Sequence, residues 1–407
     1  MKNVVENFLA SAERDQFNGT PAASLIGLIP RELDLRNEIV NLLELEHIDC
    51  VFSKRDINMH IRRLPVLAIS DQITEARRED LREFSIYPTG KAVESVYDTS
   101  KWNDRPFSKK LLIGKSQLDF ESFDMAVLER YTADPRYQVH FEDYMGRMSI
   151  GDDAFSQMGF PSRDKVSLQT FGLGVDRDRF PYVIVFLRYL ANLSPEHQQL
   201  WNSYTAGQDV RMMRPYFQSS IEGNFWKNRS ARYAIIQEML LINRMTDAIF
   251  GQKIFRDFEE AEVPIGITSF LRPTLANFEA FVLALDKHLS ERIDTKFFNG
   301  KIEMDEETPR GDNRFEVRRK GSIRLLEDWL LSALKWPDEE LVKKVIVGPL
   351  KEVRRLRQKP AHEFSKDNFS LEFHRERRRL LKDVLNSLQS MRDTFSSHQG
   401  RCCETAA

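Results

Sequence analysis

The chain has 407 residues, of which 41% are hydrophobic and 30% are charged, and this composition excludes a largely disordered protein. The 60 Lys and Arg residues nearly balance the 62 Asp and Glu residues, which gives a formal net charge of -2. The molecule as a whole is therefore not attracted to nucleic acid, and any such attraction requires a local basic patch.

The cysteines and the hydropathy pattern indicate the compartment. Cys50, Cys402 and Cys403 form no C-x-x-C pair, so the sequence predicts neither a disulfide framework nor a zinc site. The first residues are too polar for a signal peptide, and the apolar run at 181–187 is too short to span a bilayer. We expect a cytoplasmic chain that makes no membrane contact and uses no metal ion or other cofactor.

The first two thirds of the chain mix helical and extended patterns. Residues 1–125 contain short segments of both kinds, and we expect a mixed α/β N-terminal region there. Residues 126–267 begin with alternating apolar and polar residues around Gly146, which is typical of a hairpin, and contain a long helical pattern at 230–256. We therefore expect an α+β middle region in which strands precede a long helix.

The last third of the chain is predicted to be helical. Four segments have apolar residues at three- and four-residue spacing, and a polar stretch at 299–321 separates the first from the others. Consecutive amphipathic helices with mostly short connections favour an antiparallel four-helix bundle. The overall prediction is an α+β fold with this bundle at 268–398 and a flexible tail at 399–407, the four helices being 274–298, 322–334, 338–358 and 371–395.

The third of these helices, 338–358, is expected to pack through one apolar stripe that includes Leu341, Val345 and Leu350. Pro349 follows Gly348 inside the helix and should interrupt it, because proline lacks the N–H that donates to the preceding turn. Beyond this point the helix becomes strongly basic.

The most informative segment comes at the end of that helix and reads Arg357-Gln358-Lys359-Pro360-Ala361-His362. It combines a permanent cation with the side chain that titrates near neutral pH. On an unbroken helix Arg357 and His362 would point in different directions. Pro360 disfavours helical geometry at Lys359, so the helix should stop there and allow His362 to turn back toward Arg357.

A basic patch is predicted around this segment. The helix at 371–395 contributes a second basic run, and in an antiparallel pair its first half lies beside the end of the preceding helix. The two runs should therefore meet at one end of the bundle and bind phosphates. The residues assigned to RNA binding on this basis are Arg354, Arg355, Lys359, Arg375, Arg378 and Arg379.

A helical bundle whose third helix ends in Arg-x4-His resembles the HEPN superfamily of ribonucleases, which occur in toxin–antitoxin, abortive-infection and CRISPR-associated systems. The resemblance covers about the last 130 residues, and no family is identified for residues 1–265. One departure is Gln358, because many members have Asn, Asp or His directly after the Arg.

The resemblance implies a metal-independent endoribonuclease that leaves a 2′,3′-cyclic phosphate. His362 would be the general acid or base, Arg357 would neutralise the phosphorane, and Gln358 would orient the substrate or His362. The resemblance also implies a composite site between two bundles, and therefore a homodimer. RNA, with tRNA as one candidate, would be the substrate. Residues 1–265 would then sense a regulatory partner or a phage-derived trigger.

The sequence also leaves a non-catalytic interpretation open. The basic helices can be solvated faces, and a histidine that follows a helix often only contacts its terminal carbonyls. The chain would then be a non-catalytic adaptor that dimerises through its bundle and binds a partner through its N-terminal region. His374, the nearest other histidine, is expected at the surface or in a dimer contact rather than in catalysis.

Overall fold

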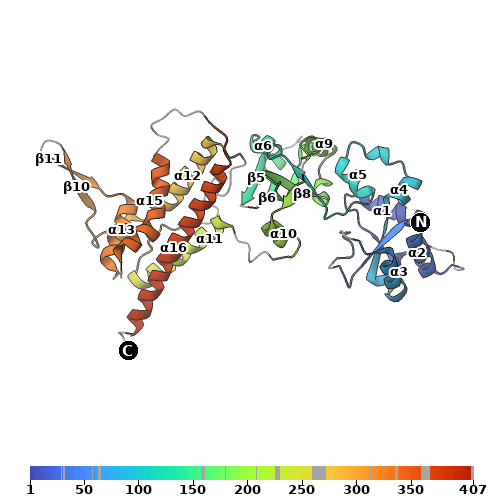
Figure 1. Ribbon diagram of the computed structural model, residues 1–407, viewed down its shortest axis with the longest axis horizontal. Helices are drawn as coiled ribbons and strands as arrows, with labels where there is room; N and C mark the ends of the chain where they lie inside the picture. The colour runs from blue at the N-terminus through green and yellow to red at the C-terminus, as the bar shows by residue number, and fades with distance from the viewer. Residues whose placement is uncertain are drawn as a thin grey trace. The chain divides into compact units, whose positions relative to one another are not determined.

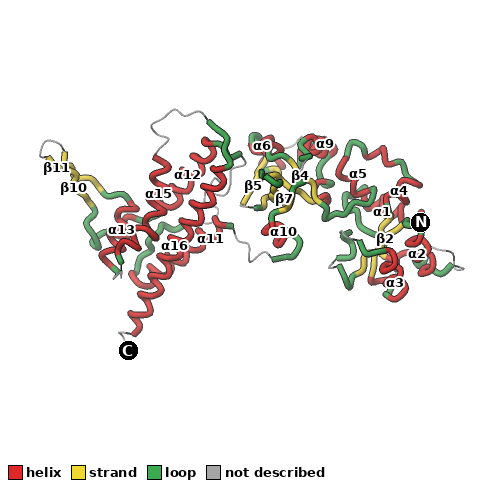
Figure 2. The backbone as a smooth tube through the Cα atoms, in the orientation of Figure 1, coloured by secondary structure: helices red, strands yellow, loops and turns green. Residues whose placement is uncertain are grey.

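The computed structural model describes the whole chain except residues 29, 31–32, 57, 63–65, 143, 157–160, 179, 208, 225–229, 259–271, 311–313, 335–337, 359–366 and 405–407. The chain forms two compact units, and each is described by itself. One comprises Met1–His140 and Tyr144–Phe217, and the other comprises Phe141–Asp143 and Gln218–Ala407. The fold is mixed α/β, and helices dominate the C-terminal part (Figure 2).

The first unit begins with a small antiparallel sheet in the order β1-β3-β2. Side chains from α2 and from both longer strands form its core, among them Leu43, Phe52 and Ile86. The N-terminus of α2 is capped by Asp34, whose carboxylate accepts from the Arg36 N–H at 2.9 Å. The elements are α1 (Lys2–Ala12), β1 (Thr20–Pro21), α2 (Leu35–Glu44), β2 (Ile48–Phe52), α3 (Ile69–Arg78), β3 (Phe84–Pro88) and α4 (Gly90–Val96).

A second sheet of six strands completes this unit, in the order β4-β8-β7-β6-β5 with β9 paired to β7. The predicted hairpin is present as β5 and β6, with Gly146 inside β6, and β8 is buried along almost its whole length. The strands are β4 (Phe120–Phe123), β5 (Tyr137–Glu142), β6 (Met145–Ile150), β7 (Ser167–Val175), β8 (Pro181–Phe186) and β9 (Arg211–Met212). The helices are α5 (Pro106–Leu112), α6 (Ala126–Thr132), α7 (Asp152–Phe155), α8 (Leu187–Leu190), α9 (Pro195–Ser203) and α10 (Arg214–Ser220).

The second unit is mainly helical and carries one hairpin (Figure 1). Ser230 caps the first long helix by accepting from the Tyr233 N–H at 3.1 Å, and Gly251 ends it with a φ of 70°, a left-handed conformation that favours glycine. The elements are α11 (Ala231–Phe250), α12 (Leu275–Ser290), β10 (Asp305–Arg310), β11 (Arg314–Arg319), α13 (Ser322–Ala333), α14 (Glu339–Leu341), a π-helical segment (Val342–Val347), α15 (Gly348–Gln358) and α16 (Glu372–Glu404).

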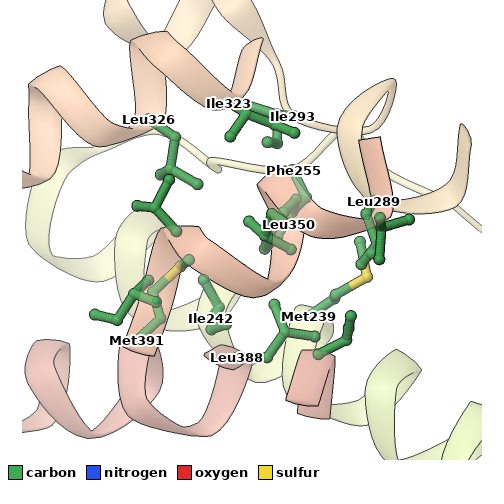
Figure 3. Packing of buried hydrophobic residues seen from close by; sticks show 14 of the residues in the cluster. Met239, Ile242, Phe255, Leu289, Ile293, Ile323, Leu326, Leu350, Leu388 and Met391 are labelled. Carbon is green, nitrogen blue, oxygen red and sulfur yellow. The ribbon is translucent and has the colours of Figure 1, made fainter. Parts of the chain in front are cut away.

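One hydrophobic core joins the long helices of this unit. Figure 3 shows Met239 of α11, Leu289 of α12, Leu350 of α15 and Leu388 of α16 among its members. The helix α11, which the sequence analysis placed before the expected boundary at 267, belongs to this core and contacts α16. The α12 residues predicted to be buried are indeed inside it: Phe278, Phe281, Val282, Leu285 and Leu289.

The structure differs from the sequence-based expectations at two places in this unit. The polar stretch 299–321 contains the antiparallel hairpin β10–β11, which extends from the helices and exposes Phe315 and Val317 (Figure 1). The expected stripe of the helix at 338–358 is wrong at Leu341 and Val345, which are exposed. The π-helical segment just before Pro349 changes the helical phase, so that Val342 and Ile346 are buried instead. No helix in the described part of the chain combines the length and the apolar character needed to cross a bilayer.

Candidate active site

Arg357 lies in the last turn of α15, three residues after Arg354. Residues three apart share a face of a helix, and in α15 this face is turned toward α12. Leu350 and Val353 are buried in the core and fix the rotation of α15 about its axis. The two arginines therefore reach across to α12 at the level of its C-terminal half.

A single buried carboxylate on α12 receives both arginines. Arg357 donates from Nη1 to Oδ2 of Asp286 at 2.6 Å, and Arg354 donates from Nε to Oδ1 at 2.9 Å. Arg354 also donates from Nη2 to the Ser290 hydroxyl at 2.6 Å. The Asp286 side chain is 1% exposed, whereas the side chains of Arg354 and Arg357 are 35% and 34% exposed. Because Arg354 contacts Asp286 and Ser290 while Arg357 contacts only Asp286, α12 and α15 run antiparallel.

The charges at this point do not cancel. Two guanidinium groups face one carboxylate, so the cluster of Arg354, Arg357 and Asp286 has one net positive charge. A buried carboxylate requires such partners, because desolvation otherwise disfavours the ionised form. The arginines remain partly in contact with solvent, and the cluster can therefore attract an external anion.

The described part of α15 ends at Gln358, close to the stop predicted from Pro360. Gln358 is exposed. His362 and Lys359 lie outside the described residues. The description resumes at Asp367, whose carboxylate accepts from the Ala276 N–H at 2.9 Å in the first turn of α12.

The other predicted RNA-binding arginines lie on the outer face of α15 and α16, among carboxylates. They are Arg355, Arg375, Arg378 and Arg379. Arg355 donates to both carboxylate oxygens of Glu352 at 2.7 Å, and these bonds raise the pKa of Arg355. Arg379 of α16 lies 3.8 Å from the same carboxylate, so the two basic runs do meet as expected. Arg379 also binds Glu376 and Asp383, and Arg375 binds Glu372. Arg378 is exposed, with no carboxylate partner in the described part of the chain.

His288 and His374 of this unit are both uncharged near neutral pH. Burial, followed by the charges of Arg377 and Arg378, lowers the pKa of His374 to about 4. Burial, followed by Arg292 and Arg232, lowers the pKa of His288 to about 4. His374 is half-buried in the chain.

Sequence reasoning missed Asp286 and Ser290. A signal was present, because Asp286 is four residues after Val282 and three before Leu289, which places a carboxylate on the apolar stripe of α12. A charged residue on such a stripe needs a buried partner. The partner itself could not be identified, since it comes from α15, 68 and 71 residues further along the chain.

Comparison with protein-family models, with curated proteins and with solved structures finds no match to this chain. Among the residues that the structure describes, no group of three or more His, Cys, Asp or Glu side chains is arranged to hold a metal ion. The function therefore has to follow from the geometry of the chain's own residues.

Proposed function

We propose that this chain is a metal-independent endoribonuclease whose site contains Arg357, His362 and Gln358. The observation that carries the proposal is the position of Arg357, which Asp286 holds at the end of α15 while a third of its side chain stays exposed. A permanently charged, oriented guanidinium is the group that stabilises a phosphorane. The role of His362 comes from the HEPN resemblance.

Covalent connectivity supports the pairing of Arg357 with His362. His362 follows Gln358 by four residues, and four residues of extended chain span at most about 14 Å. The segment that contains it connects the end of α15 to Asp367, which is bonded to the first turn of α12. His362 is therefore within covalent reach of the last turn of α15, which carries Arg357.

The proposed reaction is transesterification of the RNA backbone. His362 takes the proton of the ribose 2′-hydroxyl, and the 2′-oxygen attacks the adjacent phosphorus. Arg357 neutralises the negative charge that develops on the phosphorane oxygens. The bond to the 5′-oxygen breaks, the partner subunit's His362 protonates that oxygen, and Gln358 orients the substrate. The products are a 2′,3′-cyclic phosphate and a 5′-hydroxyl.

The wider assignment follows the resemblance. We assign α12, α13, α15 and α16 to the four-helix bundle of a HEPN-type domain, to whose core α11 contributes. A homodimer would bring two Arg357–His362 pairs together. Residues 1–265 would sense a partner or a phage-derived trigger, in a cytoplasmic toxin or abortive-infection protein. Arg355, Lys359, Arg375, Arg378 and Arg379 would guide the RNA to the site.

The test is incubation with total RNA and with tRNA in EDTA, followed by end-group analysis. The wild type is expected to produce 2′,3′-cyclic phosphate ends, and His362→Ala is expected to abolish them while the circular dichroism spectrum stays unchanged. His47→Ala, which removes a histidine from the first unit, serves as the matched control and should cleave normally. Cleavage by His362→Ala at the wild-type rate would reject the proposal.

A second candidate is a non-catalytic adaptor that dimerises through its helical unit. The ion pairs of Arg355, Arg375 and Arg379 favour it, because adjacent carboxylates reduce the positive potential of that surface. The RNA assay separates the two candidates, because both would form a dimer in solution but the adaptor would leave RNA intact.

A further inference from the structure

The two arginines that share Asp286 use different parts of their guanidinium groups. A guanidinium offers a bidentate edge, formed by Nε and one terminal nitrogen, that matches the oxygens of a phosphate. In Arg354 this edge is occupied, because Nε binds Asp286 and Nη2 binds Ser290. Arg357 binds Asp286 through Nη1 alone, and its Nε and Nη2 have no partner in the part of the chain that the structure describes.

This difference assigns different roles to the two residues. Arg354 spans Asp286 and Ser290 and braces α15 against α12, so it is a poor candidate for the RNA contact predicted from sequence. Arg357 is held from one side only, and its bidentate edge remains available to an anion. Its side chain is 34% exposed, which gives an anion access to that edge.

Stability alone does not explain a carboxylate at position 286. Replacing a buried ion pair by apolar residues of similar volume is often neutral or stabilising. Asp286 lies next to Leu285 and near Leu289 on the buried stripe of α12, where an apolar side chain would pack readily. The carboxylate does what an apolar residue cannot do, because it fixes the direction of the Arg357 guanidinium.

We infer that Asp286 is the positioning residue of the site: it holds Arg357 through Nη1 so that the Nε–Nη2 edge receives the scissile phosphodiester, with Arg354 and Ser290 as braces. The inference rests on the proposed ribonuclease function for the identity of the anion. It does not rest on that function for the orientation of Arg357, which can be measured separately.

The sign of the electrostatic effect makes the role testable. Asp286→Asn removes one negative charge beside Arg357, so electrostatics alone would attract a phosphodiester more strongly. Loss of orientation acts in the opposite direction and affects the transition state most. We expect kcat for RNA cleavage to fall about 100-fold, the loss typical of a catalytic group displaced by about 1 Å. KM should stay within about 3-fold of wild type, since ground-state binding is not the interaction removed.

Asp328→Asn is the matched control. Asp328 on α13 also binds two cations, Lys320 at 2.9 Å and Arg324 at 3.1 Å, and its side chain is 20% exposed. The substitution makes the same chemical change in the same unit without touching Arg357. If Asp286→Asn cleaves RNA as fast as Asp328→Asn and the wild type, the inference is overturned.

A second measurement separates this inference from the proposed function. Nitrogen-15 NMR of the arginine side chains, assigned with Arg357→Lys, reports the rotation of the Arg357 guanidinium with and without added inorganic phosphate. Slow rotation in the wild type and fast rotation in Asp286→Asn are expected. Identical Arg357 signals in both proteins would overturn the inference even if RNA is cleaved. If the wild type leaves RNA intact but the signals change as expected, the ribonuclease proposal fails and the positioning role stands.

Discussion

The two faces of α15 hold their arginines in different ways. Arg354 and Arg357 bind Asp286, a carboxylate that is 1% exposed, whereas Arg355 on the outer face binds Glu352, which is 30% exposed. An exposed ion pair exchanges with water and salt and contributes little, while a buried carboxylate keeps its partner in one geometry. The sequence alone shows a uniform basic run. The difference between an oriented arginine and a solvated one comes from the burial of the carboxylate that each arginine binds.

The largest expected effect is on catalysis. Arg357→Ala should lower kcat about 1000-fold, because loss of one group that stabilises the transition-state charge costs roughly 100- to 1000-fold. Arg355→Ala should instead raise KM a few-fold and make the salt dependence of RNA binding less steep, as expected for loss of one phosphate contact. Steady-state kinetics at several salt concentrations measures both. Equal effects on kcat from the two variants would remove the distinction between the faces.

The next effect is on stability. Asp286→Ala should lower the free energy of unfolding by about 2–3 kcal/mol, somewhat less than is usual when a fully buried pair is broken, because Arg354 and Arg357 can regain water. Glu352→Ala should produce a change several-fold smaller, because its pair with Arg355 is exposed. Urea unfolding at low and high salt measures the two values. The effect of Glu352→Ala should disappear at 1 M salt and that of Asp286→Ala should persist.

The smallest expected effect is on the pH dependence of stability. It compares the buried anion Asp286 with the buried neutral base His288. His288 is 2% exposed, and its folded-state pKa of about 4 lies below the unfolded value of 6.5. Between these values the unfolded chain binds more protons, so stability is complete above pH 6.5 and declines as the pH falls toward 4. The decline is at most about 1.4 kcal/mol per pH unit for this group.

His288→Asn tests this pH dependence, because asparagine does not titrate and its amide oxygen can accept from Arg292 Nε as His288 Nδ1 does at 3.2 Å. Thermal unfolding between pH 7 and 5 should vary less in the variant than in the wild type. An equally steep decline in both proteins would show that other groups, such as His374, dominate the titration.

The sequence by itself determined the local elements of the helical unit. Three- and four-residue spacing of apolar residues located α12, α13 and α16, because a helix buries one stripe. The helical pattern at 230–256 located α11 but not its end, because Gly251 stops the helix after Phe250. Pro360 predicts a helix end at Lys359, which lies outside the described residues. All of these signals act within a few residues of the chain.

Only the tertiary structure decided which polar groups meet. Asp286 and Arg357 are 71 residues apart, and their contact at 2.6 Å depends on how α12 and α15 pack. Val342 and Ile346 are buried in place of Leu341 and Val345 because a π-helical segment changes the helical phase. The spacing of apolar residues in the sequence does not show this change of phase. The physical reason is that a periodic pattern shows which face of an element is buried. It does not show which side chain of another element occupies the opposite position, and this pairing makes one arginine of a basic run the candidate for catalysis.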